Sequence, residues 1–468
     1  MTIFLFAIGC SDSTSPDITG SISGRVELLV DDGSEPVTDF SGVVVAIYSK
    51  ANLDSTLVRI NNEHPNIGVI ISQETEFDHR DYNPVAMTET NISGDFLLRN
   101  VPGGNYNLVF IKESWSIKYL YNITCDADSE NNLGVLEMHP NYILSGVIND
   151  PFVFRAEQQY IIENDVHFAN EVSIENESII SIAPNKTLNF HGPVNTGYSE
   201  RIGDKWKVIS TYSLLSVNAT VIDSSNYYNG VAFYSDDLHL KNGFFRHLRN
   251  SVHINSSNAT LEDIYVRNFG NGVSSLQSEI VISNLTLRDG YNMGLQLMGM
   301  EEFADVSNSV FLRCRDGIVA YSGGGFSISN SYFAYNNNAI YPQNCQGEIR
   351  NNSFYNNGRD IPMYIASTNI EYNNFYRSLV TGIYPRNFAT INNNNFYTTE
   401  RWFIDIIRTS TSSGSCVFND LDATNNYWGV NNVSDYLRDG NYDENCWYFI
   451  IYIPKRNNPV PEAGIERQ

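Results

Sequence analysis

The sequence predicts an all-β protein in which an antiparallel β-sandwich is followed by a parallel β-helix of about ten or more coils. Residues 18–140 consist of short β-branched runs separated by glycine and proline, and a six-residue pattern recurs nine times after residue 239. The composition, with 42% hydrophobic and 18% charged residues, is that of a packed protein. We therefore predict a linker segment (1–17), the sandwich (18–140), the β-helix with a C-terminal cap (141–455) and a tail (456–468).

The charge of the chain argues against nucleic-acid binding. The sequence holds 53 Asp and Glu against 29 Lys and Arg, which gives a net charge of −24. Such a protein repels phosphate groups, so we expect no DNA or RNA partner. No apolar run reaches the roughly 18 residues that a membrane-spanning helix needs, so no transmembrane helix is predicted.

The N-terminus is a short apolar run, MTIFLFAIGC, that ends at Cys10 and is followed by a small polar tract. This run resembles a bacterial lipobox, in which the cysteine becomes the lipidated N-terminal residue. The resemblance implies a lipid-anchored protein of the cell envelope, and Ser11 implies an outer-membrane lipoprotein that faces the periplasm or the exterior. Only nine residues precede Cys10 and none is basic, so an ordinary apolar N-terminus is the alternative.

The remaining five of the six cysteines show no CxxC spacing. This predicts neither a zinc site nor a disulfide framework. In an exported protein Cys416 and Cys446 can pair near the C-terminus. We expect the other three, Cys125, Cys314 and Cys345, to be small buried residues.

Residues 18–140 contain the runs SISGRVELLV, FSGVVVAIY and ISGDFLLRNVPGGNYNLVFIK. Their alternating apolar residues favour an antiparallel sandwich. The Gly-Asp-Phe run at 94–96 and the Pro-Gly-Gly-Asn-Tyr run at 102–106 resemble the transthyretin-like, carboxypeptidase-regulatory-type β-sandwich of bacterial surface proteins. That resemblance implies that these residues serve packing and not chemistry. The segment between Ser49 and Met87 is longer than the family pattern needs.

One six-residue pattern, which we call the frame, recurs at spacings of 21 to 32 residues. Its copies are LKNGFF (240–245), LEDIYV (261–266), ISNLTL (282–287), VSNSVF (306–311), ISNSYF (328–333), IRNNSF (349–354), IEYNNF (370–375), INNNNF (391–396) and ATNNYW (423–428). The period fits a coil of three short strands and three turns, and the β-branched and aromatic residues favour strands. The first and sixth positions are apolar almost throughout, so we expect them to point inward and to form ladders.

The third position of the frame is asparagine in seven of the nine copies, namely Asn242, Asn284, Asn308, Asn330, Asn351, Asn393 and Asn425. Asparagine tolerates the positive φ of a turn, and its amide both donates and accepts hydrogen bonds. We therefore expect the stacked copies to bond to one another as a structural ladder. Tyr372 interrupts this ladder, and Asp263 needs a donor neighbour.

Two segments carry a resemblance to known solenoids. Residues 160–192 resemble the opening coils of right-handed parallel β-helices, and residues 422–454 resemble the closing segment of the pectate-lyase-like superfold, with an Asn-Tyr-Trp-Gly turn before an Asp-rich loop. The resemblance implies a right-handed helix whose final motif is a structural cap and not an active site. Because this superfold hosts lyases, hydrolases, epimerases and adhesins, it does not fix the function.

No catalytic residue is identified from the sequence. The Gly-His-Gly and Arg-Ile-Lys signatures of polygalacturonase-like hydrolases are absent, and the adjacent Asp236 and Asp237 would point to opposite faces of a strand. No metal site and no cofactor are predicted. Lyases of this superfold use an Arg or Lys base and Ca²⁺, so Ca²⁺ is expected only if the chain is a lyase.

The residue after each frame is predicted to face outward, because side chains alternate along a strand. This column includes Arg246, Arg267 and Arg288 and, further on, Tyr355, Tyr376 and Tyr397. We predict a stripe that binds an acidic glycan, with guanidinium groups on its anionic groups and tyrosine faces under its rings. Two alternatives stay open: carboxylates such as Asp289 or Glu262 neutralise the arginines, and the tyrosines support one another without a ligand.

Together these features predict a cell-envelope lipoprotein whose β-helix is a non-catalytic binding or interaction rod for carbohydrate. The expected partner is an acidic polysaccharide or an envelope protein. The alternative is a polysaccharide lyase or another carbohydrate-active enzyme that works on the flank of the helix. The third hypothesis is that the β-helix is a passive spacer or assembly element.

Overall fold

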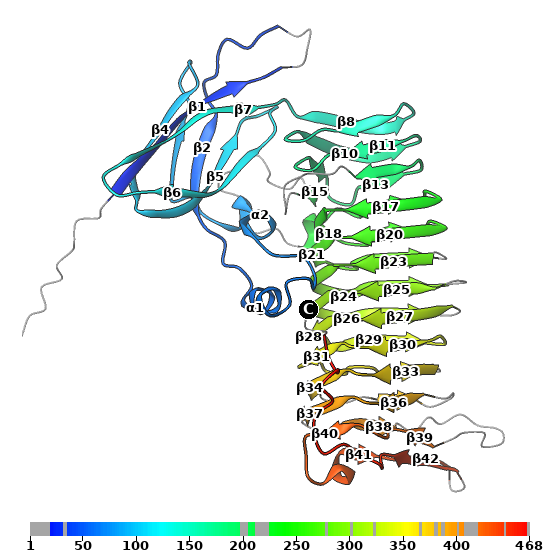
Figure 1. Ribbon diagram of the computed structural model, residues 1–468. Helices are drawn as coiled ribbons and strands as arrows, with labels where there is room; N and C mark the ends of the chain where they lie inside the picture. Colours follow the sequence, from blue (N-terminus) through cyan, green and yellow to red (C-terminus); the bar gives the residue numbers. More distant parts are fainter. Residues whose placement is uncertain are drawn as a thin grey trace, which may run out of the picture. The chain divides into compact units, whose positions relative to one another are not determined.

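The computed structural model describes residues 19–465 apart from 31–34, 197–204, 211–223, 277–278, 300–302, 322–323, 365–366, 379–381, 385–388, 400–401, 407–419 and 444–445. The chain is 57% strand and 6% helix, which confirms the all-β prediction. It divides into two compact units (Figure 1). Among the described residues, the first unit takes 19–52 and Glu76–Pro140, and the second takes Leu53–Thr75 and the chain from Asn141 on. No described helix is long and apolar enough to cross a membrane.

The first unit consists of two sheets with a shared core. Its strands are β1 (Thr19–Leu28), β2 (Val44–Ser49), β3 (Ala86–Glu89), β4 (Asp95–Pro102), β5 (Gly104–Ile111), β6 (Lys118–Cys125) and β7 (Glu130–Met138). They form the sheets β4-β1-β7 and β3-β2-β5-β6, which are antiparallel except for the parallel pair β1–β7. Val26, Ile47 and Phe110 are fully buried in the core. The predicted sandwich is confirmed, with one parallel pair that the sequence pattern did not indicate.

The long connection between β2 and β3 contains α1 (Ser55–Glu63), α2 (Gln73–Glu76) and the 3₁₀ turn η1 (His79–Asp81). Helix α1 begins at Asp54, whose carboxylate accepts the backbone N–H groups of Thr56 and Leu57 at 2.9 and 3.1 Å. Leu57 and Ile60 form its buried side. Part of this connection, Leu53–Thr75, packs with the second unit, which explains why it exceeds the length that the sandwich requires.

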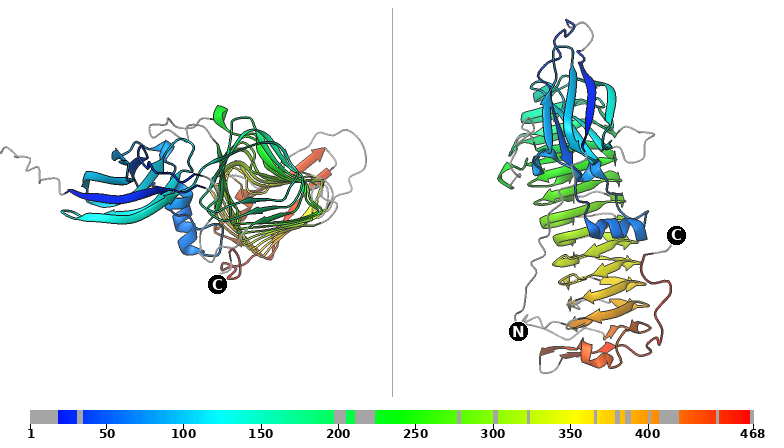
Figure 2. Two further views of the ribbon diagram at one scale, coloured as in Figure 1. Left: turned by 90° about the horizontal axis from the view of Figure 1, so that it is seen from above. Right: turned by 90° about the vertical axis from the view of Figure 1, so that its left-hand side faces the viewer.

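The second unit is a parallel β-solenoid of about ten turns, shown from the end and from the side in Figure 2. Its strands form three faces. Face A consists of β9 (Phe152–Phe154), β11 (Val172–Ile174), β14 (Val194–Thr196), β17 (Asp237–Lys241), β20 (Asn258–Glu262), β23 (Glu279–Ser283), β25 (Ala304–Ser307), β27 (Gly325–Ser329), β30 (Gln346–Arg350), β33 (Ser367–Glu371), β36 (Thr390–Asn392), β39 (Leu421–Asp422) and β44 (Ile450–Ile451).

Faces B and C follow face A around each coil. Four strands run through both, β8 (Tyr142–Ile148), β10 (Gln159–Phe168), β24 (Thr286–Met298) and β26 (Val310–Tyr321). Face B also contains β12 (Ile179–Ile182), β15 (Trp206–Ser210), β18 (Gly243–Leu248), β21 (Tyr265–Phe269), β28 (Tyr332–Ala334), β31 (Ser353–Tyr355), β34 (Asn374–Ser378), β37 (Asn395–Thr399) and β40 (Tyr427–Trp428). Face C also contains β13 (Thr187–Phe190), β16 (Gly230–Phe233), β19 (Val252–Ile254), β22 (Val273–Leu276), β29 (Asn338–Gln343), β32 (Met363–Tyr364), β35 (Gly382–Tyr384), β38 (Ile404–Ile406) and β41 (Leu437–Arg438).

The frame marks the corner between faces A and B, and its apolar positions point inward as predicted. First-position residues such as Ile349 are at most 1% exposed, and sixth-position residues are at most 5% exposed. From Phe311 to Trp428 the sixth-position rings stack at centroid distances of 4.5 to 5.1 Å. These stacks bury large aromatic side chains on every coil, and burial of this kind is the main stabilising term of the solenoid.

The third position of the frame lies in the turn. All nine third-position residues, from Asn242 to Asn425, have a positive φ between 47° and 60°, which confirms the predicted reason for the asparagines. Asp263 also finds the donor it needs, because Asn284 Nδ2 donates to its carboxylate at 3.2 Å. The predicted ladder of third-position amides, however, is replaced by a ladder one residue later.

The continuous hydrogen-bonded ladder is built from fourth-position residues. Each side chain accepts the backbone N–H of the fourth-position residue in the preceding coil at 2.7 to 3.2 Å, through Ser309, Ser331, Asn352, Asn373, Asn394 and Asn426. The four asparagines are fully buried. Because the sixth position points inward, alternation also turns the fourth inward, and a buried amide must find its partners within the protein. The ladder therefore belongs to the interior and not to the turn.

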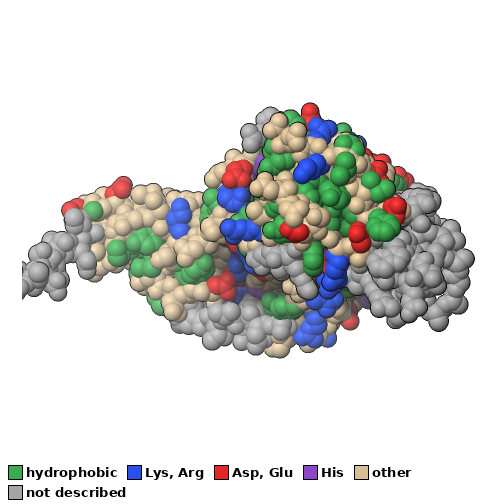
Figure 3. Space-filling view, turned by 90° about the horizontal axis from the view of Figure 1, so that it is seen from below, with side chains coloured by type: hydrophobic (Ala, Val, Ile, Leu, Met, Phe, Trp, Pro, Cys, Tyr) green, Lys and Arg blue, Asp and Glu red, His purple; other side chains and the backbone are tan. Residues whose placement is uncertain are grey.

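The Asn-Tyr-Trp-Gly segment is part of the last coils, as its resemblance implied. Trp428 stacks on Phe396 at 4.5 Å, and a Cβ on Gly429 would lie 2.4 Å from the carbonyl oxygen of Tyr397. The chain then forms η3 (Val433–Tyr436) and the antiparallel hairpin β42 (Gly440–Asp443) and β43 (Cys446–Tyr448). Apolar side chains gather on this end of the solenoid (Figure 3), and Phe449, Ile451 and Ile453 are exposed there.

Cys125, Cys314 and Cys345 are buried free thiols, which confirms the prediction for these three. Cys10, Cys416 and the side chain of Cys446 lie outside the described part of the chain. Burial raises the pKa of Cys314 to about 12 and that of Cys345 to about 11.

We expect these two buried cysteines to resist thiol reagents at about pH 8, because only the thiolate reacts and both are shielded from solvent. Peptide mass spectrometry after a short pulse of iodoacetamide should show modified Cys314 and Cys345 only when denaturant has been added. Labelling of either residue in the native chain as fast as in the unfolded chain would contradict their burial.

Candidate functional site

The outer side of face B carries the fifth frame position and the residue after the frame. The register places Arg246, Arg267 and Arg288 next to one another on β18, β21 and β24, as the predicted stripe requires. Arg246 and Arg288 are nevertheless only 2% and 3% exposed, and Arg267 is half-buried. The arginine half of the stripe therefore does not face solvent, and the expectation of an open basic surface is wrong for it.

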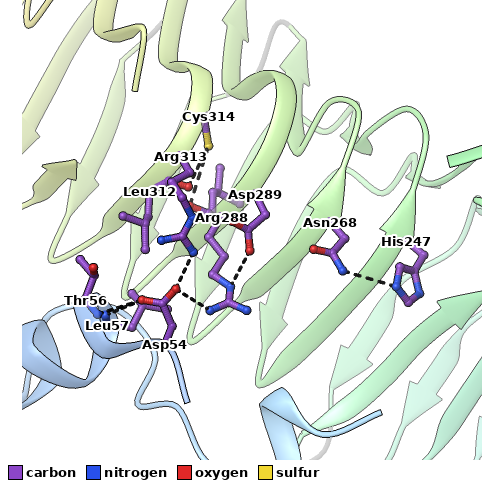
Figure 4. Close-up of polar contacts among 11 residues, drawn as sticks. Asp54, Thr56, Leu57, His247, Asn268, Arg288, Asp289, Leu312, Arg313 and Cys314 are labelled. Atoms are coloured by element: carbon purple, nitrogen blue, oxygen red, sulfur yellow. Dashed lines mark hydrogen bonds and ion pairs between the residues drawn. The ribbon is translucent and has the colours of Figure 1, made fainter. Parts of the chain in front are cut away.

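Carboxylates neutralise Arg288, as one of the alternatives predicted (Figure 4). Asp54, at the start of α1, lies 3.3 Å from Arg288 and 2.6 Å from Arg313, and Asp289 lies 3.1 Å and 2.7 Å from the same two guanidinium groups. Burial raises the pKa of the Asp54 carboxyl, but the Leu57 N–H and the two arginines outweigh it and hold the pKa below its ordinary value. Asp54 thus ties the segment Leu53–Thr75 to face B.

The segment Leu53–Thr75 follows face B beyond this ion-pair network. Arg59 donates to the Tyr332 hydroxyl at 3.0 Å and lies 5.7 Å from the ring centroids of both Tyr332 and Tyr355. Gly68 has a φ of 66° and approaches so closely that a Cβ would lie 2.6 Å from Thr286 Oγ1. Tyr355, the first tyrosine of the predicted stripe, is therefore partly covered by this segment.

A groove of about 990 Å³ lies on the same flank. The solenoid contributes Asn351, Ser353, Asn374, Tyr376, Asn395 and Tyr397 to its lining, and the end of α1 contributes Glu63 and His64. The C-terminal segment Pro459–Ala463 and Ile465 complete the lining. The structure therefore brings two residues of the predicted stripe, Tyr376 and Tyr397, into one concave site.

Tyr376 and Tyr397 form a parallel pair, with ring centroids 4.6 Å apart and planes only 2° apart. One face of each ring is therefore occupied by the other ring, and Tyr427 approaches Tyr397 edge-on at 6.0 Å. The expected stacking of a sugar under each tyrosine face is thus restricted. The pair offers the groove ring edges and phenol oxygens, which suit hydroxyl-rich ligands.

The charged residues of the groove are acidic. Glu63 and Glu462 line it, Glu63 is paired with Arg59 at 3.1 Å, and among the described residues of the lining none is Lys or Arg. These residues offer no cation to an anionic ligand, whereas tyrosine hydroxyls bond neutral polar groups. The groove chemistry therefore differs from that of the acidic-glycan stripe that the sequence suggested.

The other acidic candidates form no site in the described residues. Asp236 and Asp237 are both exposed, and Asp237 accepts a hydrogen bond from Asn258 at 3.0 Å. No group of three or more His, Cys, Asp or Glu residues in the described chain is placed to hold a metal ion.

Sequence reasoning missed Asp54, Asn374, Asn395 and the C-terminal segment. One signal was present in the frame. Its fifth position, aromatic or β-branched up to Tyr332, becomes Ser353, Asn374 and Asn395 in the coils that line the groove.

Comparison with known proteins gives no family for this chain. No protein-family model matches it, and no curated protein matches it. Among solved structures, GBS52, the minor pilin of Streptococcus agalactiae, matches with 17% identity and a TM-score of 0.15 over 26% of this chain. The match spans 46% of the pilin chain.

Proposed function

We propose that the protein is a non-catalytic binding protein of the bacterial cell envelope whose solenoid groove holds a neutral carbohydrate. The observation that carries this proposal is the lining of the groove, where the paired rings of Tyr376 and Tyr397 lie beside Ser353. Tyrosine edges pack against the apolar CH faces of sugar rings, and phenol and serine hydroxyls bond their hydroxyl groups. The volume of about 990 Å³ suits a short stretch of an oligosaccharide.

The charge pattern selects a neutral ligand over an acidic one. Arg288 is already paired with Asp54 and Asp289, so the nearest guanidinium group of the original stripe has no unmet charge to offer. Lyase chemistry on the pectate-lyase-like superfold calls for an Arg or Lys base, and the described residues that line the groove include neither. The proposal therefore takes binding, and not cleavage, as the role of the groove.

The location of the protein rests on its N-terminal sequence. Lipidation of Cys10, which lies outside the described residues, would anchor the chain to the envelope, with the outer membrane as the expected membrane. We further propose that the sandwich is a transthyretin-like, carboxypeptidase-regulatory-type domain and that the solenoid belongs to the pectate-lyase-like superfold. Mass spectrometry that detects diacylglycerol on Cys10 tests the anchor, and an intact Met1 in a membrane-free extract would refute it.

We expect Tyr376→Ala and Tyr397→Ala each to weaken binding of a neutral oligosaccharide by about tenfold, equivalent to about 1.4 kcal/mol. Calorimetry with hexasaccharides of glucose, xylose, mannose and N-acetylglucosamine, beside oligogalacturonate, measures this. Tyr291→Ala is the matched control, because Tyr291 is 56% exposed and lies outside the groove lining.

Two results would refute the carbohydrate proposal. One is a wild-type chain that binds none of the neutral hexasaccharides, or binds only the acidic one. The other is a steady rise in ultraviolet absorbance from unsaturated products when the chain is incubated with polygalacturonate and Ca²⁺, which would restore the lyase alternative.

A further inference from the structure

The C-terminal segment does not continue the solenoid but crosses it (Figures 1 and 2). After β44 the chain turns back over the outer side of face B, and we call Arg456–Ile465 the tail. The Arg456 backbone N–H donates to the Asn426 carbonyl oxygen at 2.9 Å, and its guanidinium donates to Asn393 Oδ1 at 2.9 Å. From there the tail passes one coil after another.

Asparagine side chains on successive coils hold the backbone of the tail. Asn395 accepts the Val460 N–H at 2.7 Å and donates to the Val460 carbonyl oxygen at 3.0 Å. Asn374 Nδ2 donates to the Ala463 carbonyl oxygen at 3.0 Å, and Asn351 Nδ2 donates to the Glu462 carbonyl oxygen at 3.0 Å. The tail turns between these contacts, where the Ala463 N–H donates to the Val460 carbonyl oxygen at 3.2 Å. Since the asparagines contact backbone groups, the surface holds the tail by its peptide groups.

Side-chain packing restricts which peptide fits this surface. Val460 and Ile465 are 2% and 9% exposed, so they act as two apolar anchors. Between them Gly464 has a φ of 90°, and a Cβ there would lie 2.0 Å from Asn374 Nδ2. A ligand therefore needs glycine at this place and apolar residues on either side, which is the sequence of the tail itself.

A solvent-exposed link lies within the tail, between the contacts of Arg456 and the anchor Val460. Its residues, 457–459, are all exposed, so the link can change its path without uncovering a core. A tail from a second copy can then make the same contacts on the same asparagines, at the cost of association and of a changed hinge. In the isolated chain the high effective concentration of its own tail favours the internal arrangement.

We propose that the asparagine surface formed by Asn351, Asn374 and Asn395 is a binding site for a peptide that turns as the tail does, and that its partner is the tail of a second copy of this chain. Reciprocal exchange of tails joins two copies, with both asparagine surfaces filled. The two proposals share Asn374 and Asn395, but the contacts with the tail do not involve Tyr376 or Tyr397, so variants of the two tyrosines separate carbohydrate binding from tail exchange.

Two full-length variants test the exchange directly. Gly464→Val prevents the tail from docking but leaves the asparagine surface intact. The double variant Asn374→Ala and Asn395→Ala weakens the surface but leaves the tail intact. Neither variant pairs with itself by this contact, whereas a mixture supplies one intact surface and one intact tail.

We expect the mixture at about 50 μM to form a one-to-one complex of twice the monomer mass in light scattering, while each variant alone stays monomeric. A labelled synthetic peptide of residues 455–465 should bind the Gly464→Val variant at least tenfold more tightly than the double variant. Thermal unfolding followed by circular dichroism confirms that both variants are folded, and Tyr291→Ala, which touches neither surface nor tail, serves as the folded reference. A mixture that stays monomeric while the peptide also fails to bind the Gly464→Val variant would overturn the proposal.

Discussion

Replacing Asn373 by alanine is expected to lower the free energy of unfolding of the solenoid by about 3 kcal/mol or more. The Asn373 amide donates to the carbonyl oxygens of Ile349 and Glu371 at 2.8 and 2.9 Å and to Asn394 Oδ1 at 3.1 Å. Its oxygen accepts the backbone N–H of Asn352 at 2.9 Å. All of these bonds except the one to Glu371 are buried, so an alanine leaves buried polar groups without partners as well as a small cavity.

Urea unfolding of the full chain, followed by tryptophan fluorescence, measures this effect. Asn369→Ala is the matched control, since Asn369 is an exposed asparagine on β33 of the neighbouring face. Its replacement should change the stability by no more than about 0.5 kcal/mol. Equal and small shifts for both variants would mean that the ladder contributes little, and that strand pairing and the stacked rings hold the coils together.

The frame was sufficient to predict the solenoid because the inward-facing residues and the turns are determined within each coil. An inward-facing residue at the sixth position follows from its apolar character, and asparagine at the third position follows from a positive φ, as with Asn308 at 49°. The identity of the ladder was accessible as well. Once Phe375 is placed inward, alternation places Asn373 inward too. Asparagine recurs in more coils at the third position than at the fourth, however, and the prediction therefore placed the ladder at the third position.

The burial of the arginine stripe could not be predicted from the frame. Arg288 is paired with Asp54, a residue 234 positions earlier, in the segment Leu53–Thr75 that belongs to the same compact unit as the solenoid. Nothing in the local pattern around Arg288 indicates which distant segment covers it. The same holds for the groove, because the tail and the end of α1 supply part of its lining and neither carries a periodic signal.

The second large effect is expected for the contact between Asp54 and Arg288. Asp54→Ala is expected to destabilise the docking of Leu53–Thr75 on face B by about 3 kcal/mol, because it removes a helix cap and leaves the buried Arg288 with one carboxylate fewer. Asp54→Asn keeps the cap and loses only the charge, so it should cost about 2 kcal/mol. Hydrogen exchange of the amides of α1 measures both, with acceleration of roughly 150-fold and 30-fold if local opening controls the exchange.

Lowering the pH separates the contribution of the ion pairs to the docking of Leu53–Thr75 from that of the helix cap. The pKa of Asp54 is held below its ordinary value of 3.8, so its charge stabilises the docked segment above that pH and the contribution is lost as the pH falls through the lowered pKa. In the wild-type chain, exchange of α1 should therefore accelerate only in strong acid, and Asp54→Asn should abolish this additional acid step. Asp237→Ala, which removes an exposed carboxylate elsewhere on the solenoid, should leave it unchanged. An acid step of the same size in Asp54→Asn would assign the step to another paired carboxylate, such as Asp289 or Glu74, and not to Asp54.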